Sequence, residues 1–267
     1  MLRDITLGQY YRTESIIHKL DPRVKIIGTF VFLVAIFMVN NAIAYAIAGL
    51  FLVMNIKLSN VPVKFIFRGM RSIFLLLMIS VLFNLFLTPG DPMFTVWKIK
   101  VTKEGLKLAA KMAVRLVFLI TGSSLMTLTT TPNNLTDGLE SILKPLKLVH
   151  VPVHEISMMM SIALRFIPIL LEETDKIMKA QMARCADFET GSIINRAKNM
   201  VPLLVPLFIS AFRRAMDLAM AMEARCYRGG EGRTKMKPLV YHKEDKVAYV
   251  VLVLFLIICV AVGRMKF

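Results

Sequence analysis

The fold is decided by the stretch VKIIGTFVFLVAIFMVNNAIAYAIAGLFLVMNI, residues 24–56, which is apolar almost throughout and is broken at Asn40 and Asn41. A single helix of this length would be about 50 Å long, whereas the hydrocarbon core of a bilayer is about 30 Å thick. We therefore expect two shorter membrane-spanning helices that turn at the asparagine pair.

The composition of the whole chain agrees with a membrane protein. Of 267 residues, 56% are hydrophobic, against about 45–50% apolar residues in soluble domains. The net charge of +16 is typical of nucleic-acid-binding proteins or of membrane proteins with basic cytoplasmic loops. Because most lysines and arginines flank or interrupt apolar runs, we expect the lipid bilayer as a partner and no nucleic acid. Three scattered cysteines indicate neither a disulfide framework nor a metal site.

Three further apolar runs complete the expected membrane region, at residues 72–87, 108–131 and 247–262. The first of them ends at TPGDP, a strong turn signal. The count is then five spans, with the N-terminus in the cytoplasm and the C-terminus outside. Merging the first two spans would move the large basic segment outside, against the positive-inside tendency. The cations expected inside are Arg12, Lys19, Arg23, Lys25, Lys57, Lys64, Arg68, Arg71, Arg233, Lys235, Lys237, Lys243 and Lys246, against Lys98, Lys100, Lys103 and Lys107 outside.

Residues 132–246 differ from the spans on either side. The apolar runs 156–171 and 200–212 are shorter than the roughly 20 residues that a span needs, and prolines interrupt them. After each proline the pattern becomes amphipathic. Upstream, the sequence of 133–146 predicts a shorter helix with Asp137 and Glu140 in capping-box spacing. We therefore expect three helices on or under the membrane, and three domains: 1–131 with four spans, 132–246, and 247–267 with the last span.

Two of these three helices end in the same tripeptide, first at Ala183-Arg184-Cys185 and again at Ala224-Arg225-Cys226. A cation at a helix C-terminus interacts favourably with the helix dipole, by about 0.3–1 kcal/mol. That effect does not require the same small neighbours at both ends. Small neighbours matter where another surface comes close enough for the guanidinium to bind a carboxylate. Two matched helix ends therefore predict two matched sockets on a pseudo-symmetric dimeric partner.

At these residues the chain resembles a known family, the transmembrane T components of energy-coupling factor (ECF) transporters. That family carries two Ala-Arg-Gly motifs at the ends of two long cytoplasmic coupling helices. The stretches HKLDPRVKI (18–26), ALRFIPILLEE (163–173) and EARCYRGGEGRTKMKPL (223–239) are similar to other parts of the family. The chain departs from the family in having Cys185 and Cys226 in place of glycine, which meets a need for positive φ less easily.

The resemblance implies the function. Two ATP-binding-cassette ATPases would dock on the two tripeptides, Arg184 meeting one and Arg225 the other. A separate substrate-binding S component would pack against the membrane-side faces of the coupling helices. The chain would sit in the plasma membrane, carry no catalytic residue and bind no cofactor, since ATP and Mg²⁺ belong to the ATPases. Closure of the ATPases would then reorient the S component and release a vitamin or transition-metal ion inward. The implied S-component face comprises Met178, Met182, Phe212, Met216 and Met220.

Methionine supports two readings of the same region. Nine of the 19 methionines fall between Val153 and Arg225. Methionine-rich faces repack easily and recur at promiscuous binding surfaces, which would suit a subunit shared among several S components. Filling of an ordinary core is the equal alternative.

Other function classes have weaker support. A membrane enzyme acting on lipid phosphates would need clustered carboxylates or a nucleophile and base, and a self-contained secondary transporter would show more spans and inverted repeats. The pair His150 and His154 has Pro152 between its members and no evident third ligand, so we expect a surface pair and no metal site. Lys111 and Arg115, one turn apart, are expected to face the bundle or the outer interface.

Overall fold

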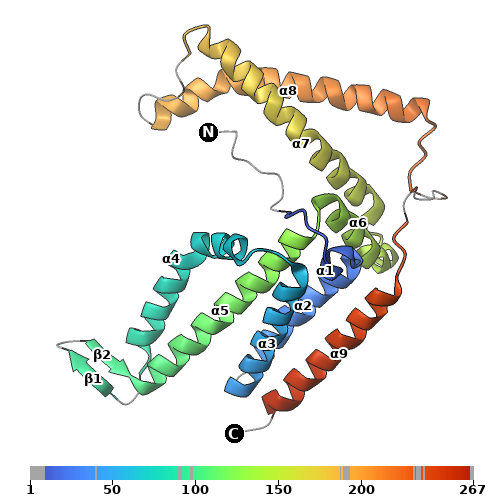
Figure 1. The fold of residues 1–267 in the computed structure, drawn as a ribbon. Helices are drawn as coiled ribbons and strands as arrows, with labels where there is room; N and C mark the ends of the chain where they lie inside the picture. The colour runs from blue at the N-terminus through green and yellow to red at the C-terminus, as the bar shows by residue number, and fades with distance from the viewer. Residues whose placement is uncertain are drawn as a thin grey trace. The chain divides into compact units, whose positions relative to one another are not determined.

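The computed structural model describes residues 10–39, 41–89, 92–96, 99–186, 188, 193–230, 232, 236 and 238–264. Several residues used above lie outside these ranges: Asn40, Gly90, Asp91, Lys98, Glu231, Arg233, Thr234, Lys235 and Lys237. The elements, in order, are α1 (Ile16–Lys19), α2 (Pro22–Met38), α3 (Ala42–Ser59), α4 (Val63–Leu87), β1 (Pro92–Val96), β2 (Ile99–Thr102), α5 (Lys103–Thr129), α6 (Pro132–Leu143), η2 (Lys144–Val149), α7 (Val153–Met182), α8 (Ile193–Ala224) and α9 (Lys243–Arg264) (Figure 1). The helical class is thus confirmed.

The chain forms two compact units. We call Gly8–Ser141 together with Leu239–Phe267 the bundle, and Ile142–Pro238 the arm unit. The units divide the chain after Ser141 and after Pro238, whereas we placed the domain limits at 131 and 246. Those domain limits stay a prediction.

The expected turn at the asparagine pair is confirmed. Helix α2 ends at Met38 and α3 begins at Ala42, so the long apolar stretch is two helices. The Asn41 side chain donates through Nδ2 to the carbonyl of Val262, 3.1 Å away in α9. The first turn of α3 is also bonded to α5, because Nε of Arg115 donates to the Tyr45 hydroxyl at 3.1 Å. Arg115 therefore faces the bundle, as expected.

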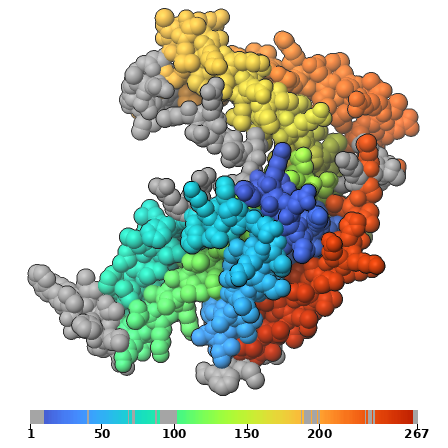
Figure 2. All heavy atoms as spheres, viewed as in Figure 1, coloured from blue at the N-terminus to red at the C-terminus, as the bar shows by residue number. Residues whose placement is uncertain are grey.

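The core of the bundle lies between α2, α3 and α9. Phe32, Ile36 and Ala48 are buried together with Phe255, and the ring of Phe255 stacks on Phe51 with centroids 4.2 Å apart. Figure 2 shows the atoms of α3 packed directly against those of α9. On α5, Gly122 permits close packing, because a Cβ there would lie 2.7 Å from the Phe32 ring.

Helices α2 and α9 run in the same direction. The amide of Asp21, at the start of α2, donates to Oδ1 of Asp245 in the first turn of α9 at 2.8 Å. Near the other ends of the same helices, Asn41 bonds to Val262. The first and last of five spans are expected to run in parallel, so this arrangement agrees with the predicted order of spans.

The joint between α2 and α9 explains the Asp-Pro-Arg of HKLDPRVKI. Asp21 is the N-cap of α2 and accepts the amide of Arg23, with Pro22 in the first helical position. The Arg23 guanidinium pairs with the Asp21 carboxylate at 2.8 Å and lies 3.8 Å from the Tyr241 ring centroid. Burial alone would raise the pKa of Asp21, but the hydrogen bonds and charge of Arg23 outweigh it and hold that pKa below its ordinary value.

Judged by length and apolar composition, four of the described helices could cross a bilayer: α3, α5, α7 and α9. The chain is therefore a multi-pass helical membrane protein. The other two predicted spans correspond to α2, with 17 residues, and to the shorter apolar part of α4, Ile73–Phe86. The count of five spans stays a prediction, and so does the place of α7, which we expected on or under the membrane.

Two local features differ from the sequence-based expectations. Between α4 and α5 the chain forms an antiparallel hairpin, β1 with β2, with Thr95 opposite Lys100, where we expected a turn alone. Helix α6 begins at Pro132, and the amide of Asn134 donates to Oγ1 of Thr131 at 3.3 Å. The predicted capping box of Asp137 and Glu140 is therefore wrong, because both residues lie within the helix.

Within the arm unit, α7 and α8 are long helices that cross each other (Figure 1). Helix α7 has 30 residues and continues through Pro168, and α8 has 32 residues and continues through Pro202 and Pro206. Each apolar run and the amphipathic run that follows it therefore belong to one continuous helix. His150 ends η2 in the left-handed region, whereas His154 lies in α7, so this pair does not share one helix face.

Candidate functional site: two matched helix ends

The end of α7 is a defined hydrogen-bonded cap. The amide of Cys185 donates to the carbonyl of Met182, and the amide of Ala186 donates to the carbonyl of Gln181, both at 3.0 Å. Together these bonds form the Schellman motif, which satisfies carbonyls that a helix end would leave without partners. Arg184 is thereby held in a fixed turn.

The end of α8 repeats this cap bond for bond. The amide of Cys226 donates to the carbonyl of Glu223 at 2.8 Å, and the amide of Tyr227 donates to the carbonyl of Met222 at 3.0 Å. The two caps coincide when the sequences are shifted by 41 residues, which superposes Arg225 on Arg184. The repeat predicted from the tripeptides is therefore also a repeat of backbone geometry.

Both cysteines occupy the position that favours glycine. Cys185 has φ +64° and Cys226 has φ +54°, so each lies in the left-handed region that ends a Schellman motif. A side chain with a Cβ is strained there by about 1–2 kcal/mol. The departure from the Ala-Arg-Gly pattern of the family thus falls on a position whose backbone conformation glycine adopts without that strain.

Both tripeptides are accessible. Ala183, Arg184 and Cys185 are exposed, and the same holds for Ala224, Arg225 and Cys226. Among the described residues, neither guanidinium takes part in an ion pair. Each end therefore presents a cation beside small side chains, so that a partner surface can approach the guanidinium closely.

An ion pair between α7 and α8 relates the two ends to each other. Oε2 of Glu173 lies 3.3 Å from Nη2 of Arg214. Residues 173 and 214 are also 41 positions apart, the same separation as the two tripeptides. Arg184 therefore lies eleven residues after Glu173 in the sequence, and Arg225 lies eleven residues after Arg214. Eleven residues of helix are about 16 Å long. The two cationic ends thus extend equally far from the ion pair, on opposite sides of the helix crossing (Figure 1).

The two expected apolar faces differ in exposure. On α8, Phe212, Met216 and Met220 are 69%, 68% and 60% exposed. They extend a stripe of exposed apolar residues at helical spacing that begins at Val201 and continues through Val205 and Phe208. On α7, Met182 is exposed and Met178 is partly buried. The larger uncovered apolar face is therefore on α8.

The described residues contain no group of three or more histidine, cysteine or acidic residues close enough to hold a metal ion.

The sequence reasoning missed the pairing of Glu173 with Arg214. The signal was present, because the distance of 41 residues between the tripeptides leads from residue 173 directly to residue 214.

The bundle of long apolar helices makes the chain a multi-pass membrane protein. The same capped Ala-Arg-Cys at the ends of α7 and α8 gives it a repeated element suited to docking. A family model described as CbiQ, cobalt transport protein, matches residues 13–236. Among curated proteins, the energy-coupling factor transporter transmembrane protein EcfT of Clostridium kluyveri is 53% identical over 264 residues, covering 98% of this chain and 97% of the relative. Proteins of the same name from Acidaminococcus fermentans and Bacillus subtilis are 52% and 47% identical, over 97% and 95% of this chain and 97% and 96% of their own lengths.

The chain therefore belongs to the family of energy-coupling factor transporter transmembrane proteins, and the resemblance seen in the sequence is confirmed. It is a membrane subunit of a transporter.

Proposed function

We propose that this chain is the coupling subunit of an ECF-type importer. In this role it transmits the motion of two ATPase subunits to a substrate-binding S component in the same membrane. The chain itself binds no nucleotide and catalyses no reaction, and ATP and Mg²⁺ are bound by the ATPases. The transported substrate belongs to the S component and is a vitamin or a transition-metal ion.

The observation that carries the proposal is the matched pair of helix ends. An ATPase dimer offers the same socket twice, and this chain offers the same Schellman-capped Ala-Arg-Cys twice, equally far from the Glu173–Arg214 pair. We assign Arg184 to one ATPase and Arg225 to the other. Where a guanidinium binds a carboxylate away from water, truncation of either partner lowers the binding free energy by about 2–5 kcal/mol.

The crossing of α7 and α8 suits the transmission of force. Closing of the two ATPases would move the two helix ends together, and rigid helices joined at Glu173 and Arg214 would transfer that movement along their length. The exposed stripe of α8 supports an apolar partner on this unit, because a contiguous exposed apolar face marks a protein or membrane contact. We assign Phe212, Met216 and Met220, with Met178 and Met182 of α7, to the contact with the S component.

We place the arm unit on the cytoplasmic side of the plasma membrane, with the N-terminus also inside. Arg165 supports this, because it is exposed in the middle of α7 and a lipid-facing arginine at mid-membrane would cost about 2.5–3.5 kcal/mol or more. The parallel course of α2 and α9 supports two spans that begin on the same side of the membrane.

The proposal is tested by reversing the charge at each helix end. Arg184→Glu and Arg225→Glu are expressed with an affinity tag in the native host, and the proteins that co-purify from membranes are identified by mass spectrometry. The unchanged chain should recover two ATPase subunits and at least one S component. Each reversal should reduce ATPase recovery by at least tenfold, the effect of about 1.4 kcal/mol.

Lys176→Glu and Arg213→Glu are matched controls, because they reverse exposed charges on the same two helices away from the tripeptides. These controls should recover the ATPases as the unchanged chain does. Full ATPase recovery by the double Arg184→Glu/Arg225→Glu variant would refute the proposal.

A further inference from the structure

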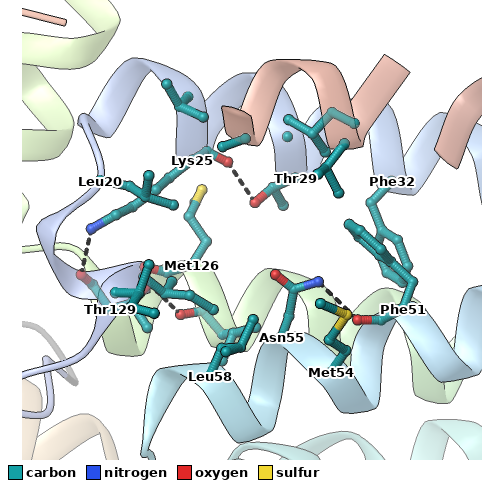
Figure 3. A pocket seen from close by; sticks show the side chains of 18 of the residues that line it. Leu20, Lys25, Thr29, Phe32, Phe51, Met54, Asn55, Leu58, Met126 and Thr129 are labelled. Carbon is teal, nitrogen blue, oxygen red and sulfur yellow. Dashed lines mark hydrogen bonds between the residues drawn. The ribbon is translucent and has the colours of Figure 1, made fainter. Parts of the chain in front are cut away.

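The bundle contains a cavity of about 310 Å³ between α1, α2, α3, α5 and α9 (Figure 3). All of its lining residues belong to the bundle. Its volume is at the lower end of the range of ligand pockets, about 300–1,000 Å³. The cavity does not involve the arm unit, so it has no part in the docking function proposed above.

The walls of this cavity are mainly apolar. Side chains from α2, α3, α5 and the turn after α1 contribute to them, among them Leu20, Phe32, Phe51, Leu58 and Met126 (Figure 3). Two polar side chains in the wall donate to their own helices: the Thr29 hydroxyl donates to the carbonyl of Lys25, and Asn55 Nδ2 donates to the carbonyl of Phe51, each at 2.8 Å. Such a surface suits an apolar chain.

Lys25 is the cation of this cavity wall. Its Nζ donates to the carbonyls of His18 and Thr129, each at 3.0 Å, which leaves one of its three N–H groups for another acceptor. Among the described residues, Lys25 forms no ion pair. The carboxylates of Asp21 and Asp245, whose charges act on Lys25, are already bound to Arg23 and to backbone amides. The charge of Lys25 is therefore complementary to an anion from outside the chain.

A second hollow of about 440 Å³ continues the cavity toward more cations. It shares Ile16, Leu58 and Glu244 with the first, and it adds Lys19 and Lys57 together with Glu14. The combined site therefore has an apolar interior and a polar mouth, and across both hollows three lysines (Lys19, Lys25 and Lys57) face two carboxylates (Glu14 and Glu244). Basic pockets between membrane helices bind the headgroups of anionic lipids.

We propose that this site binds an anionic phospholipid of the bilayer, with one acyl chain in the apolar cavity and the phosphate at Lys25. Lys19 and Lys57 at the mouth attract the rest of the headgroup. Phosphatidylcholine carries the same phosphate, so the preference for lipids with net negative charge comes from its choline cation, which Lys25 repels.

Native mass spectrometry of the complete chain in detergent tests this proposal, with dioleoyl phosphatidylglycerol and dioleoyl phosphatidylcholine as probes. Phosphatidylglycerol should bind about tenfold more tightly, a difference of about 1.4 kcal/mol, because it lacks the choline cation that Lys25 repels. Lys25→Gln should reduce phosphatidylglycerol binding to the level of phosphatidylcholine. Ala248→Leu, which fills the cavity wall without changing charge, should weaken the binding of both lipids.

Lys246→Gln is the control, because Lys246 is exposed on α9 and does not line either hollow. It should bind phosphatidylglycerol as the unchanged chain does. If Lys25→Gln does not insert, Lys57→Gln and Ala248→Leu replace it, and both should weaken phosphatidylglycerol binding. Equal binding of the two lipids by the unchanged chain, or unchanged phosphatidylglycerol binding in Ala248→Leu, would overturn the proposal.

Discussion

The bundle and the arm unit differ in how much of themselves they bury. In the bundle, Ile36 and Leu128 are almost completely enclosed, and aromatic rings from three helices meet around Phe255. In the described part of the arm unit, the buried residues are Val153, Ser157 and Leu203. The bundle is specified by its own packing. The arm unit depends on helix caps and one crossing, and it leaves an apolar stripe uncovered, as expected for a unit that other proteins complete.

The largest expected effect that sharpens this comparison is in the core. Ile36→Ala should lower the free energy of unfolding by about 2 kcal/mol or more, because it leaves a cavity in a close-packed site. Phe212→Ala, on the exposed stripe of α8, should change it by less than about 0.5 kcal/mol. Steric trapping in bicelles measures both. Equal losses in the two variants would contradict the division between a packed bundle and an uncovered arm.

The joint between α2 and α9 gives the next largest effect. Asp245 is buried and accepts the amides of Asp21 and His242 at 2.8 and 2.7 Å. Asp245→Ala leaves both amides without acceptors, and the expected loss of unfolding free energy is about 2 kcal/mol. The same measurement on Glu244→Ala, an exposed neighbour, provides the control. A loss no larger than that of the control would mean that the joint does not stabilise the bundle.

At the helix ends, Cys185→Gly and Cys226→Gly should stabilise the caps by about 1 kcal/mol, since glycine adopts positive φ without strain. The amides of Ala186 and Tyr227, which close the two Schellman motifs, should then exchange hydrogen several times more slowly in an exchange experiment read by mass spectrometry. Cys→Val at the same positions should accelerate exchange. Identical exchange rates in the cysteine, glycine and valine forms would show that strain in the left-handed conformation does not determine the stability of these caps.

The smallest expected effect is a pH dependence at His18. Burial lowers the pKa of His18, although hydrogen bonds with backbone carbonyls oppose that shift. The unfolded chain therefore binds a proton at higher pH than the folded chain. The contribution of neutral His18 to stability is present above the ordinary pKa of about 6.5 and is lost as the pH falls through the folded pKa. His18→Gln should flatten the decline in unfolding free energy between pH 7.5 and pH 5, and an unchanged slope would contradict this assignment.

Much of the bundle could be predicted, because a membrane leaves a strong signal in sequence. Long apolar runs, the break near Asn41 and the flanking cations follow directly from the thickness of a bilayer. The ends of the helices were less certain. Helix α4 begins at Val63, whereas the predicted span begins at residue 72, because backbone hydrogen bonds continue past the point where the side chains become charged. The β1–β2 hairpin was missed because its only signal was a turn.

The candidate site was predicted as residues but not as geometry. The repeated Ala-Arg-Cys is visible in the sequence, whereas the shared Schellman bonds and the positive φ of both cysteines require backbone coordinates. The error at α6 has a similar cause. The spacing of Asp137 and Glu140 suggested a helix start there, but α6 begins earlier, with Pro132 in its first position. Proline is favoured at that position of a helix.

The natural thiols of Cys185 and Cys226 allow the central claim to be measured directly. In inside-out membrane vesicles from the native host, both exposed cysteines should react slowly with a membrane-impermeant maleimide while the ATPases are bound. Both should react several times faster after the ATPases are washed off, whereas the buried Cys259 stays unlabelled. Equal labelling rates before and after the wash, or labelling only in vesicles of the opposite orientation, would contradict the account.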